Sequence, residues 1–97
     1  MKRIDYPDES EIIYLKGVVN YTEFHLKNGR KQVSSSTLRK HHENHSHFLR
    51  VSKSHVLNPK YIKRIDSSGS CIVVELKTGN KVQVSRRRQE VLNSYLT

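Results

Sequence analysis

Residues 48–58, FLRVSKSHVLN, hold the side chains in this sequence best suited to binding an anion. Apolar residues begin and end the stretch, and basic or polar residues lie between them, as expected for two short strands joined by a loop. Residues 44–65 contain no Asp or Glu, so no carboxylate there competes for the donors. We therefore predict a strand-loop-strand that presents donors to an anion; the alternative is a basic strand pair facing water. The donors are Arg50, Ser52, Lys53, Ser54 and His55.

Ser85, Arg86, Arg87 and Arg88 form a second candidate anion site, at the start of a predicted C-terminal helix. The first turn of a helix carries roughly half a positive charge, and an acidic residue there contributes about 0.3 to 1 kcal/mol. Three arginines are unfavourable there unless an anion is bound by the backbone N–H groups, the serine hydroxyl and the guanidinium groups. Arginine also matches O6 and N7 of guanine in the major groove. A solvated helix start without a ligand is the alternative.

The net charge of +9 is concentrated in the later part of the 97-residue chain. Residues 1–29 hold four basic and five acidic side chains, whereas residues 30–97 hold fourteen basic and four acidic ones. Charges of one sign repel one another and destabilise the folded state, and this cost is more easily tolerated when the charges steer a polyanion to the surface. Nucleic acid is the first candidate. A membrane surface is disfavoured, because the sequence has neither a long apolar run nor a helix with a broad apolar face beside a basic one.

Four histidines lie within the run HHENHSH. His41 and His45 are spaced to share one helical face and could chelate zinc, but no Cys or zincin-type Glu completes a ligand set. We therefore expect no metal and no cofactor, and solvent-side or half-buried imidazoles where a helix would normally carry leucines. Catalysis has no motif either: there is no nucleophile elbow, phosphate loop or carboxylate pair, so an enzyme is not predicted. The histidines are His41, His42, His45 and His47.

Cys71 is the lone cysteine, so the chain cannot form an internal disulfide. The N-terminus lacks the apolar region of a signal peptide, and both features predict a cytoplasmic protein. Because Cys71 opens the apolar run CIVVEL, it is expected to pack in the core as a small hydrophobe.

The number of exposed aromatic residues indicates whether the chain would bind a single strand or a duplex. Proteins that bind single strands stack bases on exposed aromatic side chains. Phe24 and Phe48 have the pattern of core residues, which leaves Tyr21 and Tyr61 as the exposed candidates. The composition therefore favours a duplex met by donors on loops.

The donors must be positioned by short strands of one mostly β domain. Asn28-Gly29 predicts a hairpin with a type I′ turn, and Thr78-Gly79-Asn80 predicts a second tight hairpin. SSST at residues 34–37 offers N-caps to a short helix at 38–44, and Ser85 is expected to cap a last helix. Strands are predicted at residues 12–16, 21–27, 30–34, 61–65, 71–77 and 81–84 and within 48–58, with a loop at 17–20. Side chains expected inward are Ile62, Ile65, Ile72, Val74 and Leu76, and a stripe on the last helix is formed by Val91, Leu92, Tyr95 and Leu96.

Three blocks of this sequence resemble the LytTR-type DNA-binding domain of bacterial response regulators. They are NYTEFHLKNG, HFLRVSKSHVLNPKYIKRID and LKTGNKVQVSRRR, and the resemblance extends over residues 11–96. It implies an elongated antiparallel β fold of small sheets with one short central helix and a C-terminal helix. The implied function is transcriptional regulation in a two-component system, with loops inserted into successive major grooves at promoter repeats.

Site residues also follow from the resemblance, position by position. Base contacts are implied for Asn20, Lys53 and Arg87. Ser52 stands where the family usually has His. Phosphate contacts are implied for Arg50, Ser52, Ser54, Ser85, Arg86, Tyr21 and Lys60.

The resemblance also sets the expected domains and partners. Residues 1–10 are expected to be an N-terminal tail or the end of a linker, and residues 11–97 the LytTR-like domain. The expected partner is double-stranded DNA, bound by a homodimer on direct repeats. The chain is expected to be either the C-terminal domain of a regulator whose receiver domain is missing here or a stand-alone regulator. The competing hypothesis is a basic adaptor that docks RNA or an acidic protein without base specificity.

Overall fold

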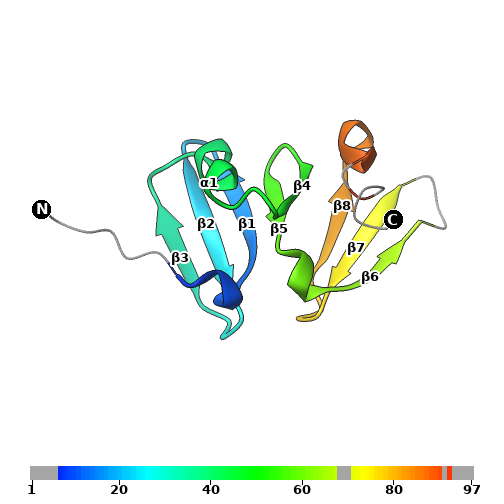
Figure 1. Ribbon diagram of the computed structural model, residues 1–97, viewed down its shortest axis with the longest axis horizontal. Coiled ribbons are helices and arrows are strands. Elements are labelled where there is room, and N and C mark those ends of the chain that lie inside the picture. Colours follow the sequence, from blue (N-terminus) through cyan, green and yellow to red (C-terminus); the bar gives the residue numbers. More distant parts are fainter. Residues whose placement is uncertain (1–6, 68–70, 91, 93–97) are drawn as a thin grey trace, which may run out of the picture.

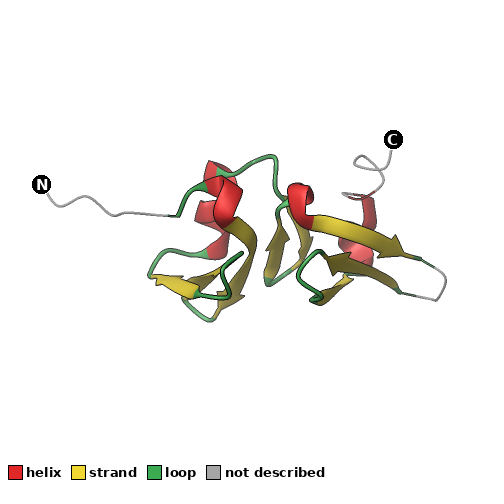
Figure 2. Ribbon diagram, turned by 90° about the horizontal axis from the view of Figure 1, so that it is seen from below, coloured by secondary structure: helices red, strands yellow, loops and turns green. Residues whose placement is uncertain are grey.

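The computed structural model describes residues 7–67, 71–90 and 92, which form two antiparallel sheets and one α-helix (Figures 1 and 2). The molecule measures 49 × 25 × 23 Å, so the predicted elongated, mostly β fold of small sheets is confirmed. In chain order the elements are η1 Glu9–Glu11, β1 Ile12–Val18, β2 Tyr21–Leu26, β3 Lys31–Ser34, α1 Leu38–Asn44, β4 Leu49–Ser52, β5 His55–Leu57, η2 Pro59–Tyr61, β6 Ile62–Asp66, β7 Ile72–Leu76, β8 Lys81–Val84 and η3 Arg86–Arg88.

The two sheets have the strand orders β3-β2-β1-β5-β4 and β6-β7-β8. Strand β5 pairs with β1 although about forty residues separate them, so this contact carries the central hairpin β4-β5 onto the first hairpin. The predicted strand-loop-strand at residues 48–58 and the helix at 38–44 are both confirmed. The loop expected at 17–20 is wrong in extent, because β1 continues to Val18 and the turn contains two residues.

The core consists of two clusters, one on each face of the five-stranded sheet. Alternate residues of neighbouring strands β1 and β5 point to opposite faces, so both strands are buried on two sides and have continuous apolar runs. One cluster lies under α1 and the other under the three-stranded sheet. The first contains Ile12, Leu15, Phe24, Leu38, Phe48 and Val56. The second contains Ile13, Val51, Leu57, Val74, Leu76, Val82, Val84 and Leu92.

Both predicted glycine hairpins form, with a different turn from the type I′ predicted at Asn28-Gly29. Gly29 has φ +85°, whereas Asn28 is outside the positive-φ region that a type I′ turn requires at both positions. The Gly29 N–H donates to the Leu26 carbonyl at 3.0 Å, and Leu26 and Arg30 bracket a three-residue loop. Gly79, with φ +94°, closes the β7-β8 loop in the same way. In a three-residue hairpin loop, a type I turn followed by a glycine in the left-handed region lets the two strands pair with their normal twist.

Several side chains differ from the predicted pattern. Cys71 is exposed, and its Sγ accepts a hydrogen bond from Gln83 Nε2 at 3.2 Å, so the prediction of a core thiol is wrong. Strand alternation explains this, because Val74 and Leu76 point inward and residue 71 has the opposite parity. Ile62 and Ile65 are half-buried against the core. Of the last predicted helix, Leu92 is buried, while Val91, Tyr95 and Leu96 lie outside the described residues.

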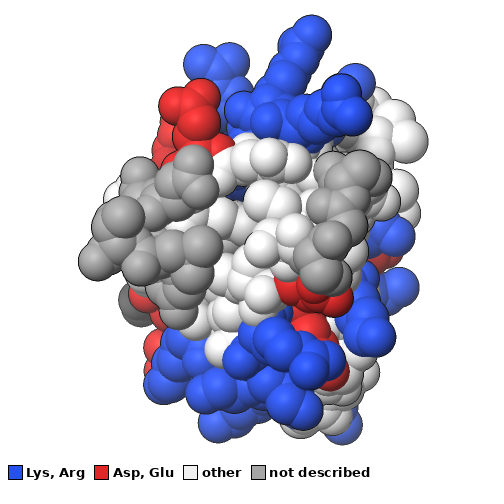
Figure 3. Space-filling view, turned by 90° about the vertical axis from the view of Figure 1, so that its right-hand side faces the viewer, with Lys and Arg blue, Asp and Glu red and all other residues white. Residues whose placement is uncertain are grey.

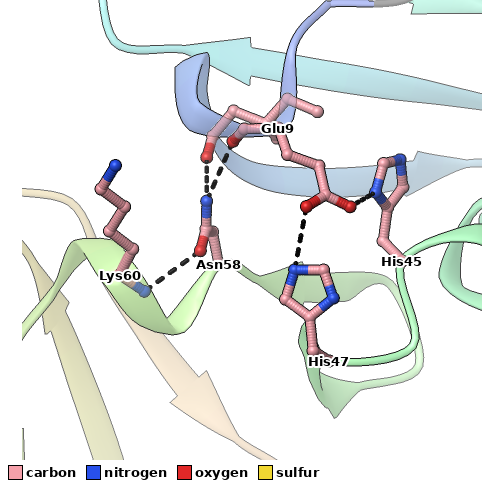
Figure 4. Close-up of polar contacts among 6 residues, drawn as sticks. Glu9, His45, His47, Asn58 and Lys60 are labelled. Carbon is pink, nitrogen blue, oxygen red and sulfur yellow. Dashed lines mark hydrogen bonds and ion pairs between the residues drawn. The ribbon is translucent and has the colours of Figure 1, made fainter.

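Asn58 joins the start of the described chain to the junction of the two sheets (Figure 4). Its buried side-chain amide donates to the carbonyls of Glu9 and Ile12 at 3.1 and 2.8 Å, and its Oδ1 accepts from the Lys60 N–H at 3.1 Å. The Tyr61 hydroxyl also donates to the Ser10 carbonyl. These bonds pack η1 against the domain; the predicted boundary after residue 10 stays a prediction.

Candidate nucleic-acid interface

Three segments predicted to carry DNA contacts lie along one edge of the molecule, the upper edge in Figure 1: the β1-β2 turn, the β4-β5 turn and η3. Two backbone hydrogen bonds join them. The Gly17 N–H donates to the Ser54 carbonyl at 2.8 Å, and the Ser85 N–H donates to the Val51 carbonyl at 2.8 Å. The central hairpin β4-β5 is thus bonded to the segment on each side of it. We call this edge, with its three segments, the loop edge.

The β1-β2 turn presents Val19 and Asn20 to solvent. Asn20 is exposed, and Val19 is 94% exposed with φ +52°, the one described non-glycine residue at positive φ. A β-branched residue is strained in this conformation, and an apolar side chain gains nothing from water. Tyr21 follows, 38% exposed. Sequence reasoning missed Val19, although GVVNY at the end of a strand is an unusual sequence for a two-residue turn.

The β4-β5 turn is held in shape by its own side chains. Ser52 Oγ and Ser54 Oγ lie 3.0 and 3.3 Å from His55 Nδ1, and the Ser54 N–H donates to Ser52 Oγ at 3.3 Å. Arg50 Nη2 donates to the Lys53 carbonyl at 2.9 Å, which leaves the exposed Lys53 side chain at the tip of the turn. The two serines therefore position the turn, and Lys53 is the donor that it presents.

The segment after β8 is the 3-10 helix η3, in which Arg86 and Arg87 are exposed. Ser85 precedes it, but the predicted N-cap is wrong, since the Ser85 side chain makes no capping hydrogen bond in this described segment. The Ser85 backbone N–H instead donates to the Val51 carbonyl on β4, and this bond fixes the start of η3, which carries the arginines. Lys and Arg side chains gather at the loop edge, at the top of Figure 3, and also at the opposite edge.

Lys60 is not at the loop edge. It belongs to η2, the light-green turn below β5 in Figure 1, and it lines a groove with Glu9 and Ser10. Nine of the ten residues implied as DNA contacts are thus in or next to the three segments of the loop edge, and Lys60 is on the far side. The nine are Asn20, Tyr21, Arg50, Ser52, Lys53, Ser54, Ser85, Arg86 and Arg87.

The histidines of HHENHSH have separate structural roles. His41 is 2% exposed, 2.8 Å from Ser34 Oγ and edge-on to Phe24, so the expectation of a solvent-side or half-buried ring is wrong for it. Because the Ser34 hydroxyl forms a hydrogen bond with the imidazole, His41 can occupy a buried position on α1 where a leucine would be expected. His45 and His47 pair with the two carboxylate oxygens of Glu9 (Figure 4). Among the described ranges, no three His, Cys, Asp or Glu side chains are grouped to hold a metal ion.

Stability is expected to fall as the solution is acidified below about pH 6.5. Burial lowers the pKa of His25, His41 and His55 in the folded protein. Neighbouring cations add to the effect, such as Lys40 at His41 and Lys16 at His55, while Glu23 opposes it at His25. The unfolded chain therefore binds more protons in this window, and the stabilisation present above about pH 6.5 is lost as pH falls through the lowered pKa values. Urea unfolding at a series of pH values measures this. His41→Leu should flatten the profile, and an unchanged profile in that variant would remove His41 from the explanation.

Comparisons with known proteins agree with this architecture. The family model described as "LytTr DNA-binding domain" matches residues 3–97. Among solved structures, the chain is similar to one described as the LytTr DNA-binding domain of a methyl-accepting/DNA response regulator from Bacillus cereus. The identity is 21% and the TM-score 0.79, over 91% of this chain and 83% of that one. A comparison with curated proteins finds no match.

None of the helices in the described part of the chain has the length and apolar character needed to cross a membrane. The family match covers nearly the whole sequence, and the solved relative has the same fold. The chain therefore belongs to the LytTr DNA-binding domain family.

Proposed function

We propose that this domain binds double-stranded DNA sequence-specifically, as the cytoplasmic output domain of a bacterial response regulator. The observation that carries the proposal is the loop edge itself, where one basic border of the molecule holds three short segments bonded to one another through the backbone. The role is one of binding and not of catalysis. A receiver domain elsewhere in the protein would control it.

Each segment of the loop edge contributes one exposed side chain that can read bases. Asn20 amide groups suit adenine, the Arg87 guanidinium suits O6 and N7 of guanine, and Lys53 also donates to guanine. Backbone N–H groups and the flanking residues Arg50 and Arg86 would hold phosphates and fix the register. We propose that the segments along this edge enter successive major grooves of the duplex.

Two copies are proposed to bind together on direct repeats of a promoter. A salt-titrated binding assay tests the function, with a repeat-containing promoter duplex and a scrambled duplex of equal length. We expect the promoter duplex to bind about a thousandfold more tightly or better, with affinity that falls steeply as salt rises. Equal and weak binding to both duplexes would overturn the proposal in favour of a basic adaptor for RNA or an acidic protein.

A further inference from the structure

Three arginines from three different elements converge next to the β4-β5 turn. Arg39 lies on α1, Arg50 on β4 and Arg88 on η3. Arg39 and Arg50 line one groove of about 450 Å³, together with Val19, Lys53 and Ser54, and η3, which carries Arg88, packs against β4. Arg39 and Arg88 are not among the ten residues that the resemblance implies as DNA contacts, although Arg88 belongs to the candidate anion site predicted at residues 85–88.

Arg50 at the centre of this group is incompletely satisfied. It is half-buried, and its Nη2 donates to the Lys53 carbonyl, but its Nε is buried without a hydrogen-bond partner among the described residues. Burial, together with the positive charges of Arg88 and Arg39, lowers the pKa of Arg50, so both of these arginines act on the Arg50 charge. A buried guanidinium donor without a partner is unfavourable, and two further cations beside it add repulsion.

The carboxylate that contacts the group does little to offset this charge. Glu43 lies 3.7 Å from Arg39, and both side chains are largely exposed, at 67% and 83%. An exposed pair at this separation contributes little, whereas a phosphate can accept several charge-assisted hydrogen bonds from guanidinium groups at once. The group is therefore built as an anion site whose ligand comes from outside the chain.

We propose that Arg39, Arg50 and Arg88 form a seat for one backbone phosphate of the duplex, between the β4-β5 turn and η3. This inference rests on the proposed function, because the phosphate is that of the DNA whose bases the loop edge reads. Seating one phosphate between two reading segments fixes the register of both on the duplex. The seat contributes affinity and register, and no base preference of its own.

The variants Arg39→Gln and Arg88→Gln test the seat. Each should lower the slope of log affinity against log salt by about one, and each should weaken the promoter and scrambled duplexes by the same factor. Arg64→Gln is the matched control, because Arg64 is an exposed arginine on β6 that pairs with Glu75 at 2.8 Å; its slope should equal that of the wild type. Thermal unfolding without DNA should show an unchanged or higher midpoint for the first two variants, since repulsion is relieved. A lower midpoint with an unchanged slope would make these arginines structural.

Single methylphosphonate substitutions in the promoter duplex locate the phosphate. One neutral position should weaken the wild type and have a much smaller effect on Arg39→Gln and Arg88→Gln. Wild-type slopes in both variants, alongside strong preference of the wild type for the promoter, would overturn the seat and leave the proposed function standing. Equal wild-type binding to the two duplexes would instead overturn the specificity, and the seat would then be judged by its slopes alone.

Discussion

Replacing Arg87 with alanine is expected to weaken binding to the promoter duplex by about 1 to 3 kcal/mol and to relax the preference at one base position. Arg87 is exposed on η3 at the loop edge, and a guanidinium that donates two hydrogen bonds to guanine discriminates against every other base pair. Affinity for a scrambled duplex should fall much less, because only one nonspecific charge is lost. Binding to a panel of promoter duplexes, each with one changed base pair, measures both effects.

Arg86→Ala is the matched control for this variant. Arg86 is the neighbouring exposed arginine on the same short helix, and it is proposed to contact a phosphate. Its loss should weaken the promoter and scrambled duplexes alike. Equal losses on both duplexes for Arg87→Ala as well would show that Arg87 does not read a base.

Asn58→Ala is expected to lower the free energy of unfolding by roughly 2 to 4 kcal/mol. The Asn58 side chain is 5% exposed and serves the Glu9 carbonyl, the Ile12 carbonyl and the Lys60 N–H together. Alanine would leave these groups without their partner at the junction of the two sheets, and a buried polar group that loses its partner costs about 1 to 3 kcal/mol. Urea unfolding measures the change.

Asn28→Ala provides the comparison on the surface. Asn28 Oδ1 accepts a hydrogen bond from the Arg30 N–H at 2.9 Å in an exposed turn, where water can replace the lost partner. The Asn28→Ala substitution should therefore lower the free energy of unfolding by less than about 1 kcal/mol. Folded Asn58→Ala protein should keep the DNA affinity of the wild type, because Asn58 lies away from the loop edge. Equal stability losses in the two variants would show that the Asn58 bonds are not a main source of stability at the junction.

The sequence by itself determined most of the local structure, because turns, caps and strand alternation depend on neighbouring residues. Gly29 and Gly79 mark hairpins since glycine adopts positive φ without strain, and the Thr37 hydroxyl caps α1 by accepting from the Lys40 N–H at 3.4 Å. Two of the three segments of the loop edge were evident from their donors, at Lys53 in a stretch without acids and at Arg87 in a run of three arginines. The third, at Asn20, came from the resemblance alone, because one asparagine in a turn has no distinctive charge.

Only the tertiary structure decided which of these residues meet. The pairing of β5 with β1 spans about forty residues, and no local pattern specifies it, yet this pairing brings the Lys53 turn beside the Asn20 turn. The same packing buries His41, which has a polar side chain but finds Ser34 as its partner, and leaves Lys60 at the far edge although it is close to Lys53 in sequence. It also brings Arg39 and Arg88 near Arg50, whose positive charge they oppose. Contacts between distant segments depend on how whole faces of strands pack, and that information is spread over the core and not held by any single motif.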